Sequence, residues 1–304
     1  MKQDIYEKIT NQIVAELEKG VRPWMRPWNA EHAAGRITRP LRANGVAYRG
    51  INTIMLWSAA VTNGYAAPIW MTYKQCTELG GQVRKGEQGS LVVYASTLHC
   101  TETDEASGEE VERAIPFMKG YTVFNVEQIE GLPEQYSRPA QTILDPVQRI
   151  AGAEAFFAAT GIEVGHGGNR AFYSESVDRV QMPFFETFRD AESYYATLAH
   201  EQIHATKHKS RLARNLGRKR WGDEGYAAEE LVAELGSAFL CADLNITQEV
   251  REDHAAYIGN WLTVLKGDKR AIFTAAAHAQ RAADFLHALI GKAGEANSDD
   301  SQVA

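Results

Sequence analysis

The sequence has little cysteine and no long apolar run. Its three cysteines, Cys76, Cys100 and Cys241, are far apart, odd in number and outside any CxxC pair, so neither a thiolate zinc cluster nor a disulfide framework is predicted. No segment approaches the roughly 18 apolar residues that a membrane helix needs. The N-terminal MKQDIYEKITNQIVAELEKG contains acids and lacks the apolar core of a secretory signal. These absences predict a cytoplasmic protein with free thiols and no membrane partner.

Length, composition and charge indicate a globular chain with two unlike parts. Its 304 residues are 44% hydrophobic and 23% charged, which is typical of one large or two ordinary soluble domains. The net charge is −7, but residues 1–99 contain 12 Lys and Arg against 7 Asp and Glu. That region has a balance of +5, so the remainder carries −12. This asymmetry predicts different partners for the two parts.

The first part has the residue spacing of mixed helix and strand. Apolar positions recur at helical intervals from Ile5, and Gly20 ends that pattern. β-branched and aromatic runs predict strands. The predicted elements are helices at 5–19 and 52–61, strands at 69–73 and 91–95, an exposed acidic hairpin loop at 101–110 and a strand at 117–129.

The second part is mostly helical. Predicted helices cover 147–159, 191–208, 226–242, 248–265 and 269–290, with short strand-like pieces at 170–181. The fold class is therefore α+β. We predict an N-terminal α+β domain at 1–130, a linker at 131–146, a mainly helical domain with a small sheet at 147–292, and a polar, frayed tail at 293–304.

A metal-binding motif, His200-Glu201-Gln202-Ile203-His204, lies within the helical pattern of 191–208. Residues four apart lie on one helix face, about 6 Å apart along the axis. Two imidazoles there can share one ion, and Glu201 beside them can take a proton from water at that ion. Chance also produces HExxH on solvated helices, so the motif needs support from a third ligand.

His208 is not predicted to be that ligand. If the helix continues, it lies about 12 Å along the axis from His200, too far to share the ion. The sequence has no Gly-x-x-His turn that would fold a third histidine back.

The downstream helix YAAEELVAELGSAFLCADL supplies better ligands. Glu230 and Glu234 are four apart on one face, in a helix otherwise so apolar that acids are costly to bury without a cation. We assign Glu230 as the third ligand and Glu234 as the carboxylate that holds a ligand histidine. Glu229 is the rival ligand, because the pattern does not separate adjacent acids.

The C-terminal half resembles the metallopeptidase domain of the ArdC antirestriction proteins of conjugative plasmids in HEQIHATKHKSRLARNL, RWGDEGYAAEELVAELGSAFLCADL and YIGNWLTVLKGDKRAIFTAAAHAQRAADFL. The N-terminal half resembles the same family in RPWMRPW, NGVAYRGINTIMLW, WMTYKQCTELGGQVRKGEQGSLVVY and GYTVFNVEQI. The resemblance covers about residues 3–292. It implies an N-terminal domain that binds single-stranded DNA, a C-terminal zincin-like fold and protection of incoming plasmid DNA from host restriction.

Basic and aromatic residues of the first part are the predicted DNA contacts. Basic grooves bind the phosphates of single strands and aromatic faces stack on their bases. The predicted contacts are Arg22, Trp24, Arg26, Trp28, Arg36, Arg39, Arg42, Arg49, Arg84 and Lys85. Trp57 and Trp70 lie in apolar runs and are expected in the core. Trp24 and Trp28 could equally clamp the chain onto a core.

Two further features lie near the motif. The loop Lys207–Arg220 carries seven positive charges, which either are solvated or bring DNA close to the metal. His166 begins a Gly-rich segment that predicts a turn or an edge strand near the site, and Tyr194 and Tyr195 are candidate oxyanion donors by proximity.

The sequence thus predicts a metallopeptidase with Zn²⁺ as the first choice of metal and Mn²⁺ as the alternative, since two histidines and a carboxylate accept both. Its partners would be single-stranded DNA and an unidentified protein substrate. One competing hypothesis is a DNA-masking protein whose metal site is structural. Another is a regulatory protease that cuts one specific repressor.

Overall fold

The computed structural model describes residues 4–25, 38–103, 110–136, 146–217, 224–246 and 254–300. The chain forms two compact units, one of residues 1–40, 47–68 and 140–304 and one of residues 41–46 and 69–139. The first unit therefore takes in chain from both sides of the predicted linker. Within the described ranges, no helix is long and apolar enough to cross a membrane.

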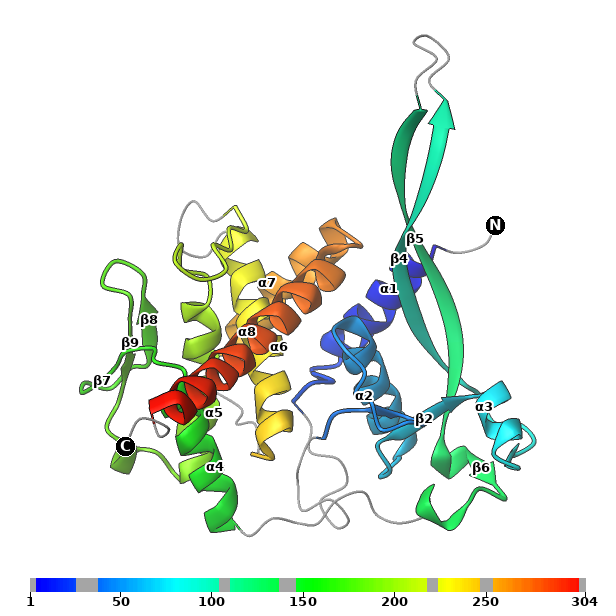
Figure 1. Ribbon diagram of the computed structural model, residues 1–304, viewed down its shortest axis with the longest axis horizontal. Coiled ribbons are helices and arrows are strands. Elements are labelled where there is room, and N and C mark those ends of the chain that lie inside the picture. Colours follow the sequence, from blue (N-terminus) through cyan, green and yellow to red (C-terminus); the bar gives the residue numbers. More distant parts are fainter. Residues whose placement is uncertain are drawn as a thin grey trace. The chain divides into compact units, whose positions relative to one another are not determined.

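The first unit is a helical assembly around α6. Its helices are α1 (Ile5–Glu18), α2 (Ile51–Asn63), α4 (Pro146–Ala159), α5 (Ala191–Ala205), α6 (Glu224–Leu244), α7 (His254–Gly267) and α8 (Ala271–Asp300). The central helix α6 packs against α5, α7 and α8 (Figure 1). Its residues from Leu231 to Ala242 are all buried, because neighbours cover it on every side.

A glycine brings α5 and α6 into close contact. A Cβ atom at Gly236 would lie 2.9 Å from the side chain of Ile203, which is closer than real Cβ atoms come to a neighbour. The absence of a side chain at Gly236 therefore allows the two helices to approach. This approach brings the acids of α6 next to the histidines of α5.

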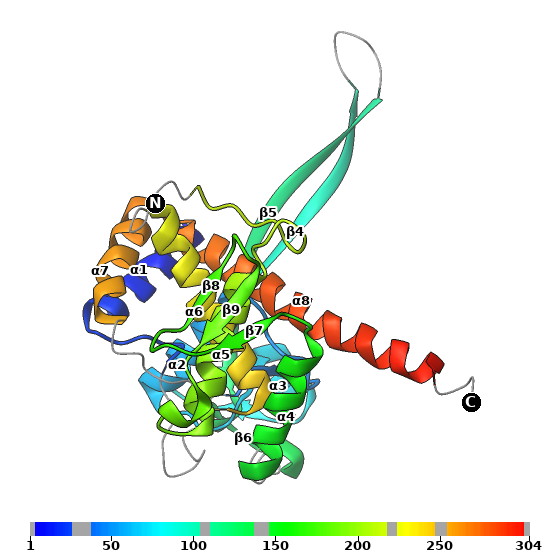
Figure 2. The ribbon, with the colours of Figure 1, turned by 90° about the vertical axis from the view of Figure 1, so that its left-hand side faces the viewer.

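A small sheet packs on α5 (Figure 2). It consists of β7 (Val164–His166), β8 (Phe172–Ser174) and β9 (Arg179–Met182), in the order β7-β9-β8. Strands β7 and β9 are parallel, whereas β8 and β9 are antiparallel. The strand-like pieces predicted at 170–181 are confirmed as the hairpin of β8 and β9.

The second unit contains a mixed four-stranded sheet and a second, two-stranded one. Its elements are β1 (Leu41–Arg42), β2 (Ile69–Thr72), α3 (Tyr73–Glu78), β3 (Gln82–Val83), β4 (Ser90–Thr103), β5 (Glu110–Asn125) and β6 (Ile129–Glu130). The sheet orders are β1-β2-β5-β4 and β3-β6. In both ribbon views β4 and β5 form a long twisted ribbon (Figures 1 and 2), paired from Ser90↔Val123 to Thr103↔Glu110.

Several element ends differ from the predicted ones. Helix α5 stops at Ala205, three residues early, because side chains from the following loop bind its last carbonyls: Arg211 Nε donates to Ala205 O at 2.8 Å. Helix α8 continues to Asp300, so the tail expected to fray is helical over most of its length. The short α3 was not predicted; a capping box between Thr72 and Gln75 starts it. The ends of the acidic loop predicted at 101–110 are strand instead, since residues 101–103 belong to β4 and residue 110 to β5; residues 104–109 lie outside the described ranges.

Candidate metal centre

Two helices bring three potential metal ligands together. His200 and His204 face α6 from adjacent turns of α5, and Glu230 faces them from α6. The Nε2 atom of His200 lies 3.5 Å from Glu230 Oε2, and the Nε2 atom of His204 lies 3.5 Å from Glu230 Oε1. One donor atom from each of the three residues falls within 4.8 Å of the others. The predicted trio therefore converges on one point.

The other ring nitrogen of each histidine faces a second carboxylate. His204 Nδ1 lies 3.1 Å from Glu229 Oε1, and His200 Nδ1 lies 3.7 Å from Glu234 Oε2. A carboxylate beside Nδ1 favours a proton on that nitrogen and leaves the Nε2 lone pair to bind a metal. The structure therefore places Glu230, rather than its rival Glu229, beside the two Nε2 atoms.

A buried arginine holds Glu229 in place. Arg214 Nε and Nη2 donate to the two oxygens of Glu229 at 2.8 and 2.6 Å. The same guanidinium donates to Thr206 Oγ1 and to the carbonyl of Ile203. The side chain of Arg214 is only 1% exposed, so this charge belongs to the interior and not to a solvated loop.

An arginine from the N-terminal segment supports the other histidine. Arg22 Nη1 lies 3.3 Å from Glu234 Oε1, and both side chains are buried. The two histidines thus have parallel supports, His204–Glu229–Arg214 and His200–Glu234–Arg22. Sequence reasoning identified the acids but placed Arg22 among the DNA contacts and Arg214 in the basic loop, although two buried acids beyond the ligand imply two cations nearby.

The charge balance of the site favours a bound cation. Burial alone would lower the pKa of His204, but the carboxylates of Glu230 and Glu229 outweigh it and raise that pKa to about 9. Burial would raise the pKa of Glu230, yet His204 and His200 hold it well below its usual range. Within the described part of the chain, the ion-pair partners of Glu230 are the two histidines, whereas Glu229 pairs with Arg214 and Glu234 with Arg22. Two neutral imidazoles and one carboxylate suit a divalent ion that takes the place of a proton here.

Glu201, the predicted general base, is buried on α5 beside His200. The candidate oxyanion donors Tyr194 and Tyr195 belong to an aromatic cluster with Phe185. Tyr194 Oη is 2.9 Å from His166 Nε2, so the segment that begins at His166 starts from strand β7 and contacts α5. His166 is the last residue of β7, which lies at the edge of the small sheet, so the edge strand that was one of the two expectations is present here.

His208 lies outside the metal-binding group, as predicted, though for a different reason. The helix ends before it, and its Nδ1 contacts Ser210 Oγ at 2.7 Å and Asp178 Oδ2 at 3.5 Å. Asp178 also pairs with Arg211. Of the basic loop Lys207–Arg220, Arg211 and Arg214 are therefore engaged by acids of the unit itself, and residues 218–220 lie outside the described ranges.

The predicted DNA contacts of the N-terminal segment are largely turned inward. Trp24 is fully buried and its ring lies 6.1 Å from that of Trp261, so of its two expected roles it has the one in the core and does not present a face to DNA bases. Arg22 supports Glu234, and Arg39 makes a two-pronged contact with Asp243 at 2.8 and 3.0 Å. Burying these charges is possible because α6 supplies an acid for each.

The remaining predicted contacts differ in their surroundings. Arg26, Trp28 and Arg36 lie outside the described residues. Arg49 pairs with Asp284 on the surface, and Arg84 pairs with Glu87 at 2.9 Å. Arg42 and Lys85 are exposed. Trp57 and Trp70 are buried in the core, as expected.

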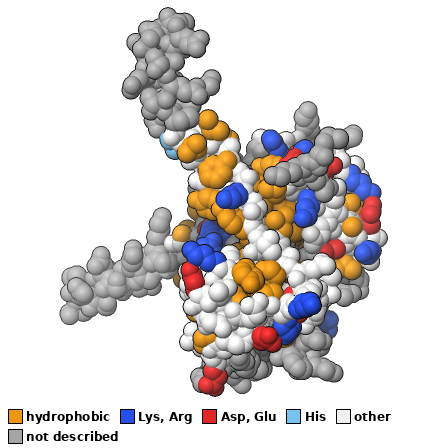
Figure 3. All heavy atoms as spheres, turned by 90° about the vertical axis from the view of Figure 1, so that its right-hand side faces the viewer, with side chains coloured by type: hydrophobic (Ala, Val, Ile, Leu, Met, Phe, Trp, Pro, Cys, Tyr) orange, Lys and Arg blue, Asp and Glu red, His pale blue; other side chains and the backbone are white. Residues whose placement is uncertain are grey.

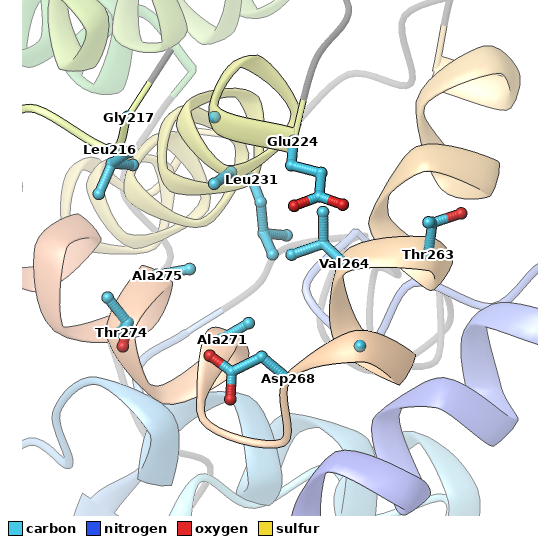
Figure 4. A pocket seen from close by; sticks show the side chains of 13 residues that line it. Leu216, Gly217, Glu224, Leu231, Thr263, Val264, Asp268, Ala271, Thr274 and Ala275 are labelled. Atoms are coloured by element: carbon cyan, nitrogen blue, oxygen red, sulfur yellow. The ribbon is translucent and has the colours of Figure 1, made fainter.

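Two pockets of the first unit lie near α6. One, of about 520 Å³, lies between the start of α6, the end of α7 and the start of α8, with Glu224 and Asp268 at its wall (Figure 4). It includes none of the three metal-binding candidates. The other, of about 330 Å³, is lined by Glu229, Arg214 and Lys207, and therefore borders the support of His204.

Comparison with known protein families identifies both parts of the chain. Residues 3–124 match the family described as the N-terminal domain of anti-restriction factor ArdC. Residues 151–278 match the family described as zincin-like metallopeptidase. These two matches fall on either side of the predicted linker.

Individual proteins are similar over nearly the whole chain. The uncharacterized protein y4eC of Sinorhizobium fredii is 48% identical over 290 residues, covering 94% of this chain and 92% of that protein. The DNA primase TraC of Escherichia coli is 39% identical over 303 residues, which are 94% of this chain but only 27% of the primase.

Two crystal structures of the antirestriction protein ArdC from the R388 plasmid are also similar. The metal-free structure superposes with a TM-score of 0.80 at 47% identity and covers 95% of this chain and 99% of its own. The Mn(II)-bound structure gives 0.76 at 46% identity and covers 95% and 98%.

Proposed function

The chain belongs to the ArdC antirestriction family, and on this basis we propose that it protects incoming plasmid DNA from host restriction by binding single-stranded DNA, with a metal-dependent peptidase in its zincin-like domain. DNA binding is assigned to the N-terminal part, residues 1–130, and peptide hydrolysis to residues 147–292. The protein that is cut is unidentified.

One observation carries the peptidase proposal. Both Nε2 atoms of the HExxH histidines face Glu230 at 3.5 Å, while each Nδ1 atom faces another glutamate. This is the arrangement that holds a catalytic divalent ion with three protein ligands and leaves further positions for water and substrate. Zn²⁺ and Mn²⁺ both suit these ligands, and the R388 relative crystallised with Mn(II).

Each residue of the site has a defined task in this proposal. An ion held by His200, His204 and Glu230 would polarise the scissile carbonyl and lower the pKa of the attacking water. Glu201 accepts the proton of that water and passes it to the leaving amine. Glu229 and Glu234 keep the two imidazoles in the tautomer and orientation that bind a cation.

Replacement of Glu201 by Gln tests this division of tasks. Because Glu201 moves a proton and is not assigned as a ligand, Glu201→Gln should lower hydrolysis of fluorescently labelled casein by about 10²- to 10⁴-fold without changing Mn²⁺ affinity by calorimetry. Wild-type protein treated with a chelator is the metal-dependence control. Full hydrolysis by the variant would rule Glu201 out as the base.

A second candidate function has its own support. The side chains of His200, His204 and Glu230 are only 7%, 10% and 14% exposed. An ion bound by them would hold α5 and α6 together, which is what a structural metal does. In that case the protein acts by masking single strands. Glu201→Gln then leaves plasmid survival in a restricting host unchanged, whereas a variant that no longer binds DNA lowers plasmid survival.

A further inference from the structure

The β4–β5 ribbon has two unlike faces. Residues directly opposite each other in an antiparallel pair have side chains on the same face, and faces alternate along each strand. The register pairs Val92 with Tyr121, Tyr94 with Lys119, Ser96 with Phe117 and Leu98 with Ile115. These eight side chains therefore share one face, which we call the aromatic face.

Large apolar side chains are exposed on the aromatic face. Tyr94 is 54% exposed, Phe117 43% and Tyr121 40%. Leu98 and Ile115 are exposed beyond them, nearer the hairpin turn. Figure 3 shows hydrophobic side chains, in orange, gathered just below the grey end of the ribbon. A run of exposed rings on one side of a ribbon is the kind of surface that binds a partner.

The opposite face lacks such rings. On β4 this face carries Val93, Ala95, Thr97 and His99. Opposite them on β5 are Gly120, Met118, Pro116 and Ala114. The two strands of an exposed ribbon pair through backbone hydrogen bonds, and this pairing does not require aromatic side chains on either face. The concentration of three rings on one face is therefore a property that pairing alone does not require.

One lysine lies among the rings of the aromatic face. The centroids of Tyr94 and Phe117 lie 6.2 Å apart with tilted planes, and Lys119 Nζ lies 5.2 Å from the centroid of Tyr121. Phe117, Lys119 and Tyr121 alternate on one strand, so successive side chains stand about 6.8 Å apart. Between Val92 and Leu98 and between Ile115 and Val123, Lys119 is the only charged side chain on this face.

Rings interleaved with a lysine, with no acid among them, match single-stranded nucleic acid. Bases stack on aromatic faces regardless of sequence, and a lysine between rings attracts the phosphates that join them. A protein partner would not require a positive charge at this place. The acids of segment 101–110 repel phosphates and would confine a strand to the part of the ribbon away from the turn.

We propose that the aromatic face binds single-stranded DNA, with bases stacked on Tyr94, Phe117 and Tyr121 and a phosphate beside Lys119. This proposal rests on the proposed single-strand binding and names the surface that performs it. None of these four residues was among the predicted contacts, because alternation over a few residues also fits an ordinary half-buried strand.

The test measures binding of fluorescein-labelled dT20 to the full chain by anisotropy. Phe117→Ser and Tyr94→Ser should each weaken binding about 5- to 100-fold, and Phe117→Trp should retain it. Lys119→Gln should reduce the slope of log affinity against log salt by about 0.7, the value for one lost phosphate contact. Phe172→Ser in β8 is the matched control, because Phe172 is 49% exposed but lies in the first unit. It should bind like wild type.

The possible outcomes separate this proposal from the function on which it rests. If wild type binds dT20 and the ring variants bind equally well, the aromatic face is not the DNA site although single-strand binding stands. If wild type does not bind, single-strand binding itself fails and the proposal fails with it. If the ring variants change only the sedimentation of the protein, the face joins two copies of the chain and the proposal is overturned. Equal melting temperatures and Mn²⁺ affinities confirm that each variant is folded.

Discussion

The metal centre of α5 and α6 buries charged side chains, whereas the ribbon of β4 and β5 exposes aromatic ones, and each placement costs free energy unless a partner is present. In the metal centre, charged groups are buried and each has an opposite charge nearby, as Glu229 has Arg214 and Glu234 has Arg22. On the ribbon, aromatic groups are exposed and a single lysine stands among them. Buried charge needs a partner inside the fold, whereas exposed aromatic surface needs one outside it. The two regions therefore indicate function in opposite ways.

The largest expected effect comes from unpairing a buried charge in the metal centre. Arg214→Met leaves Glu229 buried without its cation, so we expect the free energy of unfolding to fall by about 3–5 kcal/mol. Urea unfolding in the presence of a chelator measures this directly. Arg49→Met, which removes an exposed pair with Asp284, should cost less than about 1 kcal/mol. Similar losses in the two variants would contradict the contrast between buried and exposed pairs.

A smaller effect distinguishes support of a ligand from ordinary packing. Arg22→Gln loosens Glu234 and hence His200, so Mn²⁺ affinity should fall about 10- to 100-fold. Arg39→Gln is the matched control, because Arg39 is as buried as Arg22 and also pairs with an acid of α6, Asp243. It should lower stability without lowering Mn²⁺ affinity. If both variants lose affinity equally, Arg22 acts only through the general stability of α6.

The smallest effect is a pH dependence in which the stability of the ion-free protein falls with rising pH while its Mn²⁺ affinity rises. The pKa of His204 is raised to about 9 in the ion-free protein, above the unfolded value of about 6.5. Its contribution to stability is therefore fully present below about pH 6.5 and is lost as pH rises through 9. Mn²⁺ needs the neutral ring, so Mn²⁺ affinity should rise by up to about tenfold per pH unit over the same window.

Melting temperatures of the chelated protein and Mn²⁺ titrations from pH 6 to 9.5 measure the two slopes. Glu230→Gln removes the main charge that raises this pKa and should flatten the stability slope. Metal affinity that stays constant across the window would show that His204 is neutral throughout, and that the carboxylates do not act on it as the geometry indicates.

The metal centre was predictable to a greater extent than the ribbon. HExxH in a helical pattern requires both histidines on one face, whatever the rest of the fold. Acids in the apolar helix of Glu230 and Glu234 required a cation. By contrast, the alternation of residues in a short strand is the same whether an aromatic side chain is exposed or buried. Trp24 shows that even an aromatic residue in a Pro-rich, basic segment can belong to the core.

The sequence by itself determined the helical character of α5 and α6, the pair of histidines His200 and His204 on one helix face, the hairpin of β4 and β5 and the hairpin of β8 and β9. These follow from local periodicity, because side chains four apart on a helix or two apart on a strand share a face in any fold. Only the tertiary structure decided between Glu229 and Glu230, since adjacent residues point about 100° apart and the rotation of α6 depends on contacts such as Gly236 against Ile203. It also decided that Arg22, Trp24 and Arg39 turn inward, because their partners lie more than 200 residues away along the chain.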